Sequence, residues 1–325
     1  MKSSFFKNLG PIRYSTIKEH FESVPINIDE DTPFNEFTSI KNLKLGGLSF
    51  LTDTHFDKEN ILNDGTIICS QSIHKKFKND NPLIIVNDLH SAVAKLSNIF
   101  YRFLTYEEIK NLGKPKIGTN CNISQSAIIE NGAVIGKNVH ISAGCYVGYN
   151  CVIGDNTFID SNTVITNSII AENTHIGRNS SLGQQGFGFA ISKDKNIRIF
   201  HSGRVIIQEG VNVGSNCTID RGSFGDTIIG QNTYIDNLCH IAHNVAVGNN
   251  CIFAAMTGIA GSAIIGNDVM TGGQVGIAGH IKIGNNVQIA AQSGVLKDIG
   301  NDSSVMGHPA IDKFKYIRKY KKNYA

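Results

Sequence analysis

The sequence predicts a chain that is mainly an all-β domain, a parallel β-helix of hexapeptide repeats, preceded by a small α/β domain and followed by a short helix. Apolar residues recur at every sixth position through most of residues 113–308. Of the 33 glycines, 29 lie from Gly113 onward, and no proline occurs between Pro115 and Pro309. Many glycines without proline are typical of short strands joined by tight turns, as in a solenoid of repeats.

Length, charge and composition exclude several classes of protein. The chain has 325 residues, with 30 basic against 27 acidic side chains, so binding to nucleic acid is not indicated. Apolar residues make up 41% of it, which excludes disorder as the main state. No apolar run reaches the roughly 18 residues of a membrane span, and the start lacks the apolar stretch of a secretory signal. We expect a cytoplasmic protein with no stable membrane insertion.

Residues 1–112 have few glycines and no sixfold repeat, and mixed patterns there predict an α/β domain. A serine cap predicts a short helix over Ser15–Val24. Apolar runs predict three strands, Leu48–Leu51, Thr66–Cys69 and Leu83–Val86. An amphipathic helix is predicted over Asp88–Phe103, with Asp88 as its N-cap.

The ladder of inward-pointing residues begins at Ile117, and neither the helical period of 3.6 nor the strand period of 2 fits it. Gly or Asn follows many ladder residues, at turns where the backbone takes positive φ. Each ladder residue should stack on the coil below it, at about 4.8 Å. Two insertions, about 184–204 and 222–226, should leave the ladder as loops. The ladder segments are Ile117–Ile165, Ile170–Leu182, Ile207–Ile219 and Ile229–Val295, broken in the last only by Thr271.

This sixfold pattern resembles that of the hexapeptide acyltransferases. The resemblance implies a left-handed parallel β-helix with three faces, in which three hexads make one coil and residues eighteen apart lie directly above one another. It implies about nine coils over residues 113–308.

The seven cysteines are interpreted as structural. Cys69 stands in the first domain, and each of the others lies two residues before a ladder position, where a small apolar side chain fits. No two are eighteen residues apart and no CxxC pair occurs, so we expect no stacked pair, disulfide or zinc site. The six in the ladder are Cys121, Cys145, Cys151, Cys217, Cys239 and Cys251.

His243 is the centre of the most conspicuous polar constellation in the ladder. It follows the ladder residue Ile241 by two places, at a turn where its side chain can face outward. Asp236, one hexad plus one residue earlier, is a candidate to orient the imidazole. Gly261 lies one coil above at the same corner, where its N–H can face a developing oxyanion. His280 lies two coils plus one residue after His243, on the same edge.

The segment Ile235-Asp-Asn-Leu-Cys-His-Ile-Ala-His-Asn-Val245 resembles the active-site segment of the UDP-3-O-acylglucosamine N-acyltransferases, which act in lipid A synthesis. Thr218-Ile-Asp-Arg-Gly222, Gly186-Phe-Gly-Phe-Ala190 in the first insertion and the preceding α/β domain match the same family. The related UDP-N-acetylglucosamine O-acyltransferases share the coil and a similar His segment but lack the N-terminal domain.

The resemblance implies a role for each residue of the constellation. His243 would be the general base that takes a proton from the glucosamine 2-amine as it attacks a 3-hydroxyacyl thioester on acyl carrier protein. Asp236 would orient His243, the Gly261 N–H would stabilise the oxyanion, and His280 would help to hold substrate or oxyanion. No metal or other cofactor is implied, since the acyl donor arrives as a thioester on the phosphopantetheine of acyl carrier protein. The family packs three coils side by side, so a homotrimer is implied.

The N-terminal domain would bind the uridine of the UDP-sugar lipid precursor. Gly47-Leu-Ser-Phe-Leu51 resembles the family's uridine-binding segment, and Phe50 matches its stacking aromatic. The positions that are commonly Asn and Tyr are here Asp53 and Phe56. Two aromatic rings can still stack on a base, while an amide donor and a phenol hydroxyl are lost.

Two further motifs near the constellation receive structural interpretations. The first insertion is expected to form a lobe beside the site, with Gln185 where the family tends to have an acid. Asp220 and Arg221 are expected to form a salt bridge in a turn. Residues 309–325 are basic, and we expect them to form a helical tail that caps the coil or docks acidic acyl carrier protein.

Other functions remain open from the residues alone. A sugar O-acyltransferase or a CoA-dependent acetyltransferase would use the same scaffold, and an assay with both sugar acceptors discriminates them. A metal-dependent enzyme of the carbonic-anhydrase type would use His240, His243 and His280 as ligands, and metal analysis would reveal it. A β-helix without catalysis would serve only as a binding scaffold.

Overall fold

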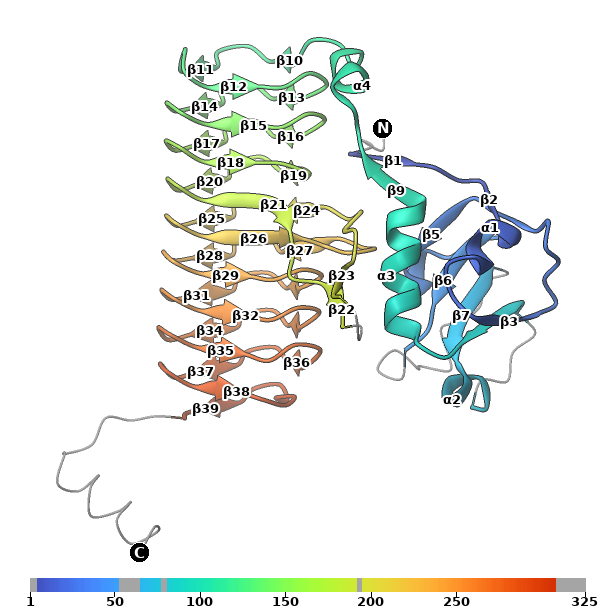
Figure 1. Ribbon diagram of the computed structural model, residues 1–325. Helices are drawn as coiled ribbons and strands as arrows, with labels where there is room; N and C mark the ends of the chain where they lie inside the picture. The colour runs from blue at the N-terminus through green and yellow to red at the C-terminus, as the bar shows by residue number, and fades with distance from the viewer. Residues whose placement is uncertain (1–4, 53–64, 77–80, 192–194, 308–325) are drawn as a thin grey trace, which may run out of the picture.

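The computed structural model describes residues 5–52, 65–76, 81–191 and 195–307, in which a long β-helix lies beside a smaller N-terminal unit (Figure 1). The helix α3 (Leu89–Phe100) runs along the side of that unit that faces the coil. None of the helices in these ranges is long and apolar enough to cross a membrane. The predicted C-terminal helix, Asp53 and Phe56 lie outside the described residues.

The N-terminal unit is a five-stranded sheet with short helices. Its order is β3-β8-β7-β6-β5, antiparallel only between β3 and β8. The elements of this unit are β1 (Phe6–Asn8), β2 (Ile12–Arg13), α1 (Tyr14–Lys18), β3 (Ser23–Ile26), β4 (Pro33–Phe34), β5 (Glu36–Thr38), a 3-10 turn at Ile40–Asn42, β6 (Gly47–Phe50), β7 (Thr66–Ser70), α2 (Gln71–His74), β8 (Leu83–Val86), α3, β9 (Tyr101–Phe103) and α4 (Tyr106–Lys110).

Two predicted helices are shorter than expected. The N-cap at Asp88 is confirmed, since its side chain accepts the Ser91 N–H at 3.0 Å, but α3 ends at Phe100. Residues 101–103 are extended instead, because they pair with β1 as β9. The helix predicted over Ser15–Val24 is only α1. Residues 23–26 pair with β8, and Pro25 disfavours helical backbone at the residue before it.

The coil consists of three parallel sheets, one for each face, and the chain visits them in turn. The first sheet holds β10 (Lys116–Ile117), β13 (Val134–Ile135), β16 (Val152–Ile153), β19 (Ser168–Ile170), β24 (Val205–Ile207), β27 (Thr227–Ile229), β30 (Ala246–Val247), β33 (Ile264–Ile265) and β36 (Lys282–Ile283). The second holds β11 (Asn122–Ile123), β14 (His140–Ile141), β17 (Phe158–Ile159), β20 (His175–Ile176), β25 (Asn212–Val213), β28 (Tyr234–Ile235), β31 (Ile252–Phe253), β34 (Met270–Thr271), β37 (Gln288–Ile289) and β39 (Ser304–Val305). The third holds β12 (Ile128–Ile129), β15 (Tyr146–Val147), β18 (Val164–Ile165), β21 (Ser181–Gln185), β26 (Thr218–Arg221), β29 (His240–Ile241), β32 (Gly258–Ile259), β35 (Gly276–Ile277) and β38 (Gly294–Val295).

The predicted ladder residues form the core of this coil. They stack in register, for example Ile241 against Ile219 and Ile259, and most are fully buried. In Figure 1 the chain descends while the front strands run to the right and the return lies behind, so the coil is left-handed. The strand β39 gives the second sheet a tenth member, beyond the nine coils expected.

The corners between sheets carry the backbone conformation that the Gly and Asn pattern predicts. Asn138 and Asn156 have φ of 56° and 55°, and the Asn138 amide donates to Asn156 Oδ1 at 3.0 Å one coil above. Leu238 and Met256 depart from this pattern, with φ of 62° and 64° at the corner between the second and third sheets. Positive φ is unfavourable for such side chains, so these two corners are strained.

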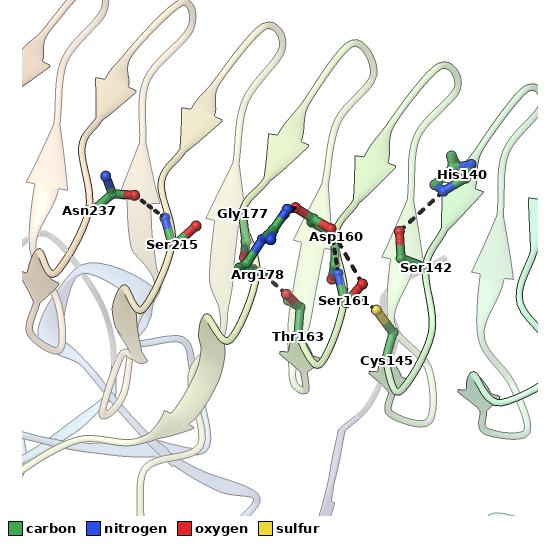
Figure 2. A network of polar contacts seen from close by, with 10 residues as sticks. All are labelled: His140, Ser142, Cys145, Asp160, Ser161, Thr163, Gly177, Arg178, Ser215 and Asn237. Carbon is green, nitrogen blue, oxygen red and sulfur yellow. Dashed lines mark hydrogen bonds and ion pairs between the residues drawn. The ribbon is translucent and has the colours of Figure 1, made fainter.

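Polar contacts tie successive coils together along this same corner (Figure 2). Arg178 pairs with Asp160 of the preceding coil at 3.0 Å, and Asn237 Oδ1 accepts the Ser215 N–H at 2.7 Å. Cysteines take part as well: the seven thiols are free, and Cys217 donates to the Asp236 carbonyl at 3.1 Å. The pairing of Thr218 with His240 places Cys239 one coil after Cys217 in the same column. The expectation of no stacked pair was therefore wrong, because the second insertion places these two residues one coil apart at a separation of 22.

The two insertions leave the coil at one corner, where the third sheet ends. The first contains the antiparallel pair β22 (Phe189–Ala190) and β23 (Ile197–Arg198), which we call the lobe together with residues 186–188 and 199–201. The lobe contacts α3, since the Phe200 N–H donates to Ser97 Oγ and Asn98 donates to the Arg198 carbonyl, both at 2.8 Å. The lobe thereby joins the N-terminal unit to the coil.

The inward and outward residues of one strand should differ sharply in their effect on stability. Ile265 is 2% exposed and Ile264 is 42% exposed, though they are neighbours in β33. We expect Ile265→Ala to lower the free energy of unfolding by about 2–5 kcal/mol, through lost burial and the cavity left behind. Ile264→Ala serves as the matched control with a much smaller loss. Guanidinium unfolding followed by circular dichroism measures both, and equal losses would contradict the inward ladder.

Candidate active site

His243 lies where the third sheet turns into the first, one coil before Gly261 at the same corner. The Ser262 N–H donates to the His243 carbonyl at 2.9 Å, which fixes the two corners one coil apart. A Cβ added to Gly261 would lie 2.8 Å from both Cε1 and Nε2 of His243. The ring therefore packs flat against the glycine, and the predicted juxtaposition of His243 and Gly261 is formed.

The hydrogen bonds of His243 determine which of its nitrogens carries the proton. Its Nδ1 lies 3.1 Å from Asn244 Oδ1. That oxygen also accepts the Ser223 N–H at 2.9 Å and faces the Ser223 hydroxyl at 2.7 Å. Because an amide oxygen only accepts, Nδ1 of a neutral His243 is the protonated nitrogen. Its Nε2 then has a free lone pair, which is the form a general base requires.

The backbone of Gly261 lies next to the ring of His243. The Gly261 carbonyl accepts the His280 N–H at 3.1 Å, so His280 occupies the next corner up. Its side chain is exposed there. Within the described residues, the Gly261 N–H has no hydrogen-bond acceptor, so it is available to a ligand next to Nε2.

Asp236 does not contact His243 within one chain. It lies on the corner between the second and third sheets, next to the Asn237 seen in Figure 2. Its Oδ1 accepts the Asn237 N–H at 2.7 Å, and the side chain is exposed. A separation of one hexad plus one residue moves a side chain to the next corner of the prism. Asn244 takes the place at Nδ1 that the sequence interpretation gave to Asp236.

The lobe contributes a second histidine to the site. His201 packs edge to face on His243, with ring centroids 5.1 Å apart. It is fully buried, and its Nδ1 accepts the Gly186 N–H at 3.2 Å. Burial is the main cause that lowers the pKa of His201 to about 3, so the ring is neutral. Gly186 and Gly188 have to be glycines here, because a Cβ on either would lie within 3.0 Å of these rings.

Arg221 fixes the lobe to the coil and does not pair with Asp220. Its guanidinium donates to the carbonyls of His201 and Gly183, at 2.8 and 3.0 Å, and to Gln185 Oε1 at 3.3 Å. Burial lowers its pKa to about 10. The predicted salt bridge between Asp220 and Arg221 is therefore wrong. Among the described residues, the ionic neighbour of Asp220 is His240, at 3.7 Å.

The N-terminal unit reaches the same corner through aromatic residues. Phe50, at the end of β6, lies 5.2 Å from the ring of Phe224 in the second insertion. The preceding residue, Ser223, is the one that hydrogen-bonds Asn244. The predicted nucleotide-binding aromatic is thus connected with the His243 corner by a short series of contacts.

The three histidines proposed as metal ligands are not gathered. His240 points outward from β29, with its Nδ1 2.7 Å from Thr218 Oγ1. In the part of the chain that the structure describes, no group of three His, Cys, Asp or Glu side chains is placed to hold a metal ion.

A neutral His201 makes the stability of the fold depend on pH. Because its pKa is about 3 in the folded state and about 6.5 when unfolded, the unfolded chain binds the extra proton between these values. Stability is therefore lost as pH falls below about 6.5, by up to about 1.4 kcal/mol per pH unit. His201→Gln, which keeps an acceptor for Gly186, should show a shallower decrease in urea-unfolding experiments between about pH 6 and pH 4. An unchanged slope would show that His201 is not held neutral by the fold.

The chain matches two family profiles over its coil. The profile described as GMPPB C-terminal domain matches residues 112–221. The profile described as bacterial transferase hexapeptide (six repeats) matches 226–261 and 262–297. The two matches of this second profile together contain His243, Gly261 and His280.

Individual proteins resemble the chain over part of its length. It is 51% identical over 72 residues to the UDP-3-O-acylglucosamine N-acyltransferase of Caulobacter vibrioides (strain NA1000 / CB15N), which is 22% of this chain and 21% of that protein. It is 54% identical over 71 residues to the enzyme of the same name from Maricaulis maris (strain MCS10), again 22% and 21%. These matches span about a fifth of the relatives' length.

A solved structure shares the architecture of the coil. The UDP-N-acetylglucosamine acyltransferase from Campylobacter jejuni matches with a TM-score of 0.52 and 27% identity, over 62% of this chain and 82% of that one. The chain is thus a hexapeptide-repeat protein with a left-handed parallel β-helix that is similar, over about a fifth of its length, to the UDP-3-O-acylglucosamine N-acyltransferases.

Proposed function

We propose that the protein is an acyltransferase that moves a 3-hydroxyacyl group from acyl carrier protein to the 2-amine of UDP-3-O-(3-hydroxyacyl)glucosamine, in lipid A biosynthesis. The observation that carries this proposal is the His243 corner: a histidine with a free Nε2 lone pair, beside a glycine N–H that has no acceptor among the described residues. A base and an oxyanion donor on one small site are what acyl transfer from a thioester requires.

The proposed reaction uses groups of this chain for each proton. Nε2 of His243 takes a proton from the amine as the amine nitrogen forms a bond to the thioester carbonyl carbon. The Gly261 N–H, with help from His280, stabilises the resulting oxyanion. When the carbonyl re-forms, the C–S bond breaks and the phosphopantetheine thiolate takes the proton from His243. No metal or further cofactor takes part, since the thioester is already activated.

The outer face of the third sheet offers a place for an apolar acyl chain near His243, which favours the proposal. Above His240, the outward positions are Gly258, Gly276 and Gly294, and a Cβ added to any of them would meet nothing within 4 Å. The half-exposed side chains of Leu238 and Met256 flank the start of this glycine strip. A strip without side chains leaves room for a hydrocarbon chain, and contact with its apolar borders would remove apolar surface from water.

The partners follow from the same proposal. Phe50 and Phe56 would stack on the uracil base of the UDP-sugar lipid precursor, and Asp53 would belong to the same uridine site. Three copies of the coil would form a homotrimer with the sites between neighbours. The basic residues of 309–325 would favour docking of acidic acyl carrier protein. We propose that this takes place in the cytoplasm.

Replacing His243 should remove the base and leave the fold. We expect His243→Ala to lose most turnover in the transfer of radiolabelled 3-hydroxyacyl from acyl carrier protein to UDP-3-O-acylglucosamine, by about 10²-fold or more. The assembly and the melting temperature should stay close to wild type. Wild-type activity should persist with EDTA present.

Three results would contradict parts of the proposal. Absence of wild-type transfer to the amine would exclude the N-acyltransferase, and transfer to the hydroxyl of UDP-N-acetylglucosamine would identify the O-acyltransferase instead. Loss of activity with EDTA would indicate a metal-dependent mechanism.

Gly261 should not tolerate even one methyl group. In Gly261→Ala the new Cβ would lie 2.8 Å from Nε2 of His243, so the ring would be displaced from its place under the N–H. We expect kcat to fall by about 10²-fold, the scale for loss of one oxyanion donor. Gly300→Ala is a matched control, because its Cβ would also meet nothing within 4 Å and Gly300 lies outside the glycine strip. Full activity of Gly261→Ala would contradict the assigned oxyanion site.

A further inference from the structure

Asp220 is a buried carboxylate beside the strand that leads to His243, and the proposed mechanism does not use it. It belongs to β26, which lies directly before β29 in the third sheet, with Thr218 paired to His240 and Ile219 to Ile241. Continuing this register places Asp220 one coil before Ala242, between His240 and His243. Its side chain points outward like that of Thr218, yet Asp220 is only 5% exposed. A buried carboxylate at this place requires partners.

A bulge in the preceding coil supplies one of these partners. The register of β21 against β26 shifts between Leu182 and Gln185, and Gly183 in the bulge has φ of 83°. The shift turns Gln184 toward Asp220, so that Gln184 Nε2 donates to Asp220 Oδ1 at 2.8 Å. The Ser181 hydroxyl donates to Gln184 Oε1 at 3.0 Å, which sets the amide in that orientation. Bulges beside active sites commonly re-aim a side chain in this way.

The other carboxylate oxygen faces His240, which precedes His243 by three residues. Asp220 Oδ2 lies 3.7 Å from His240 Nε2, while His240 Nδ1 is held by Thr218 Oγ1. Burial is the largest influence on the pKa of Asp220 and raises it. Four neighbours oppose this rise, in the order His240, the Gln184 hydrogen bond, His243 and Arg221. Arg221 directs its donors to the carbonyls of His201 and Gly183 and to Gln185, and His201 beside His243 is neutral. The two site histidines are therefore the groups whose charge Asp220 can balance.

We propose that Asp220 is the positioning carboxylate of this site, which stabilises His243 in its protonated form during acyl transfer. This inference rests on the proposed function. His243 becomes an imidazolium when it takes the proton of the amine, and Asp220 stays ionised throughout. The proton leaves again to the thiolate, so no proton is transferred to Asp220. Asp220 would thereby supply the negative charge that the sequence interpretation sought from Asp236, while Asn244 holds Nδ1.

The proposal predicts a change in the pKa of His243 that needs no substrate to be observed. An opposite charge within a few ångströms raises the pKa of a histidine, so removal of that charge should lower it. Asp220→Asn should lower the pKa of His243 by about one unit, a tenfold loss of proton affinity. The measurement is hydrogen–deuterium exchange at the His243 Cε1–H against pH, by mass spectrometry of the purified full chain. Asp220→Glu, which keeps the charge, should retain most of the wild-type pKa.

Controls and kinetics separate this role from a purely structural one. Asp160→Asn removes a carboxylate paired to Arg178 on another corner and should leave the pKa of His243 unchanged. In the transfer assay, Asp220→Asn should lower kcat and move the rising limb of kcat/KM to lower pH by the same shift. If the Asp220→Asn variant does not fold, Asp220→Ser replaces it in the experiment, because it removes the same charge with a smaller side chain.

Two results would overturn the inference, and both differ from a failure of the proposed function. One is an unchanged pKa of His243 in folded Asp220→Asn and Asp220→Ser. The other is a lowered pKa in Asp236→Asn alone, which would restore Asp236 as the partner. A protein that transfers no acyl group at all would refute the proposed function, while the exchange experiment would still report whether Asp220 stabilises charge on His243.

Discussion

The stacking of one coil on the next is the constraint on which the rest of the structure depends. Each short strand hydrogen-bonds the strands one coil before and after it, so the neighbours of every side chain are fixed by the register. A ladder residue therefore points into the core, and a corner residue stays directly between the corner residues of the coils before and after it. The fit of His243 beneath Gly261 follows from this register and needs no separate device.

The same register decides what the sequence could and could not predict. His243, Gly261 and His280 lie in an uninterrupted run of hexads, so counting by eighteen placed them correctly on one edge. Asp236 was misplaced because a separation of seven turns the chain to the next corner. The insertions hid Asp220 and His201, since across them the spacing between stacked residues is 22 or 37. Asn244 was readable as the residue next to His243, but only the Ser223 contacts reveal which atom faces Nδ1.

Around His243 only a few ionisable groups are buried, and each of them reduces the energetic cost of its burial in a different way. Arg221 keeps its charge by donating to backbone carbonyls and lying over the rings of Phe6 and Phe103, 5.1 and 5.7 Å away. His201 avoids the cost of burial by staying neutral. Asp220 is itself buried and lies 3.7 Å from His240, so a positive charge on that histidine has a counter-charge beside it. Electrostatic interactions are stronger in such surroundings than in bulk solvent.

The lobe and the second insertion both leave the coil at a corner, and this has a consequence for how such a protein can change. A solenoid is stabilised by contacts between neighbouring repeats, so its folding is governed by short separations along the chain. Extra residues at a corner lengthen a loop at a small entropic cost and leave the stacked strands in place. These loops can therefore change in length and sequence while the stacked framework that holds His243 and Gly261 stays unchanged.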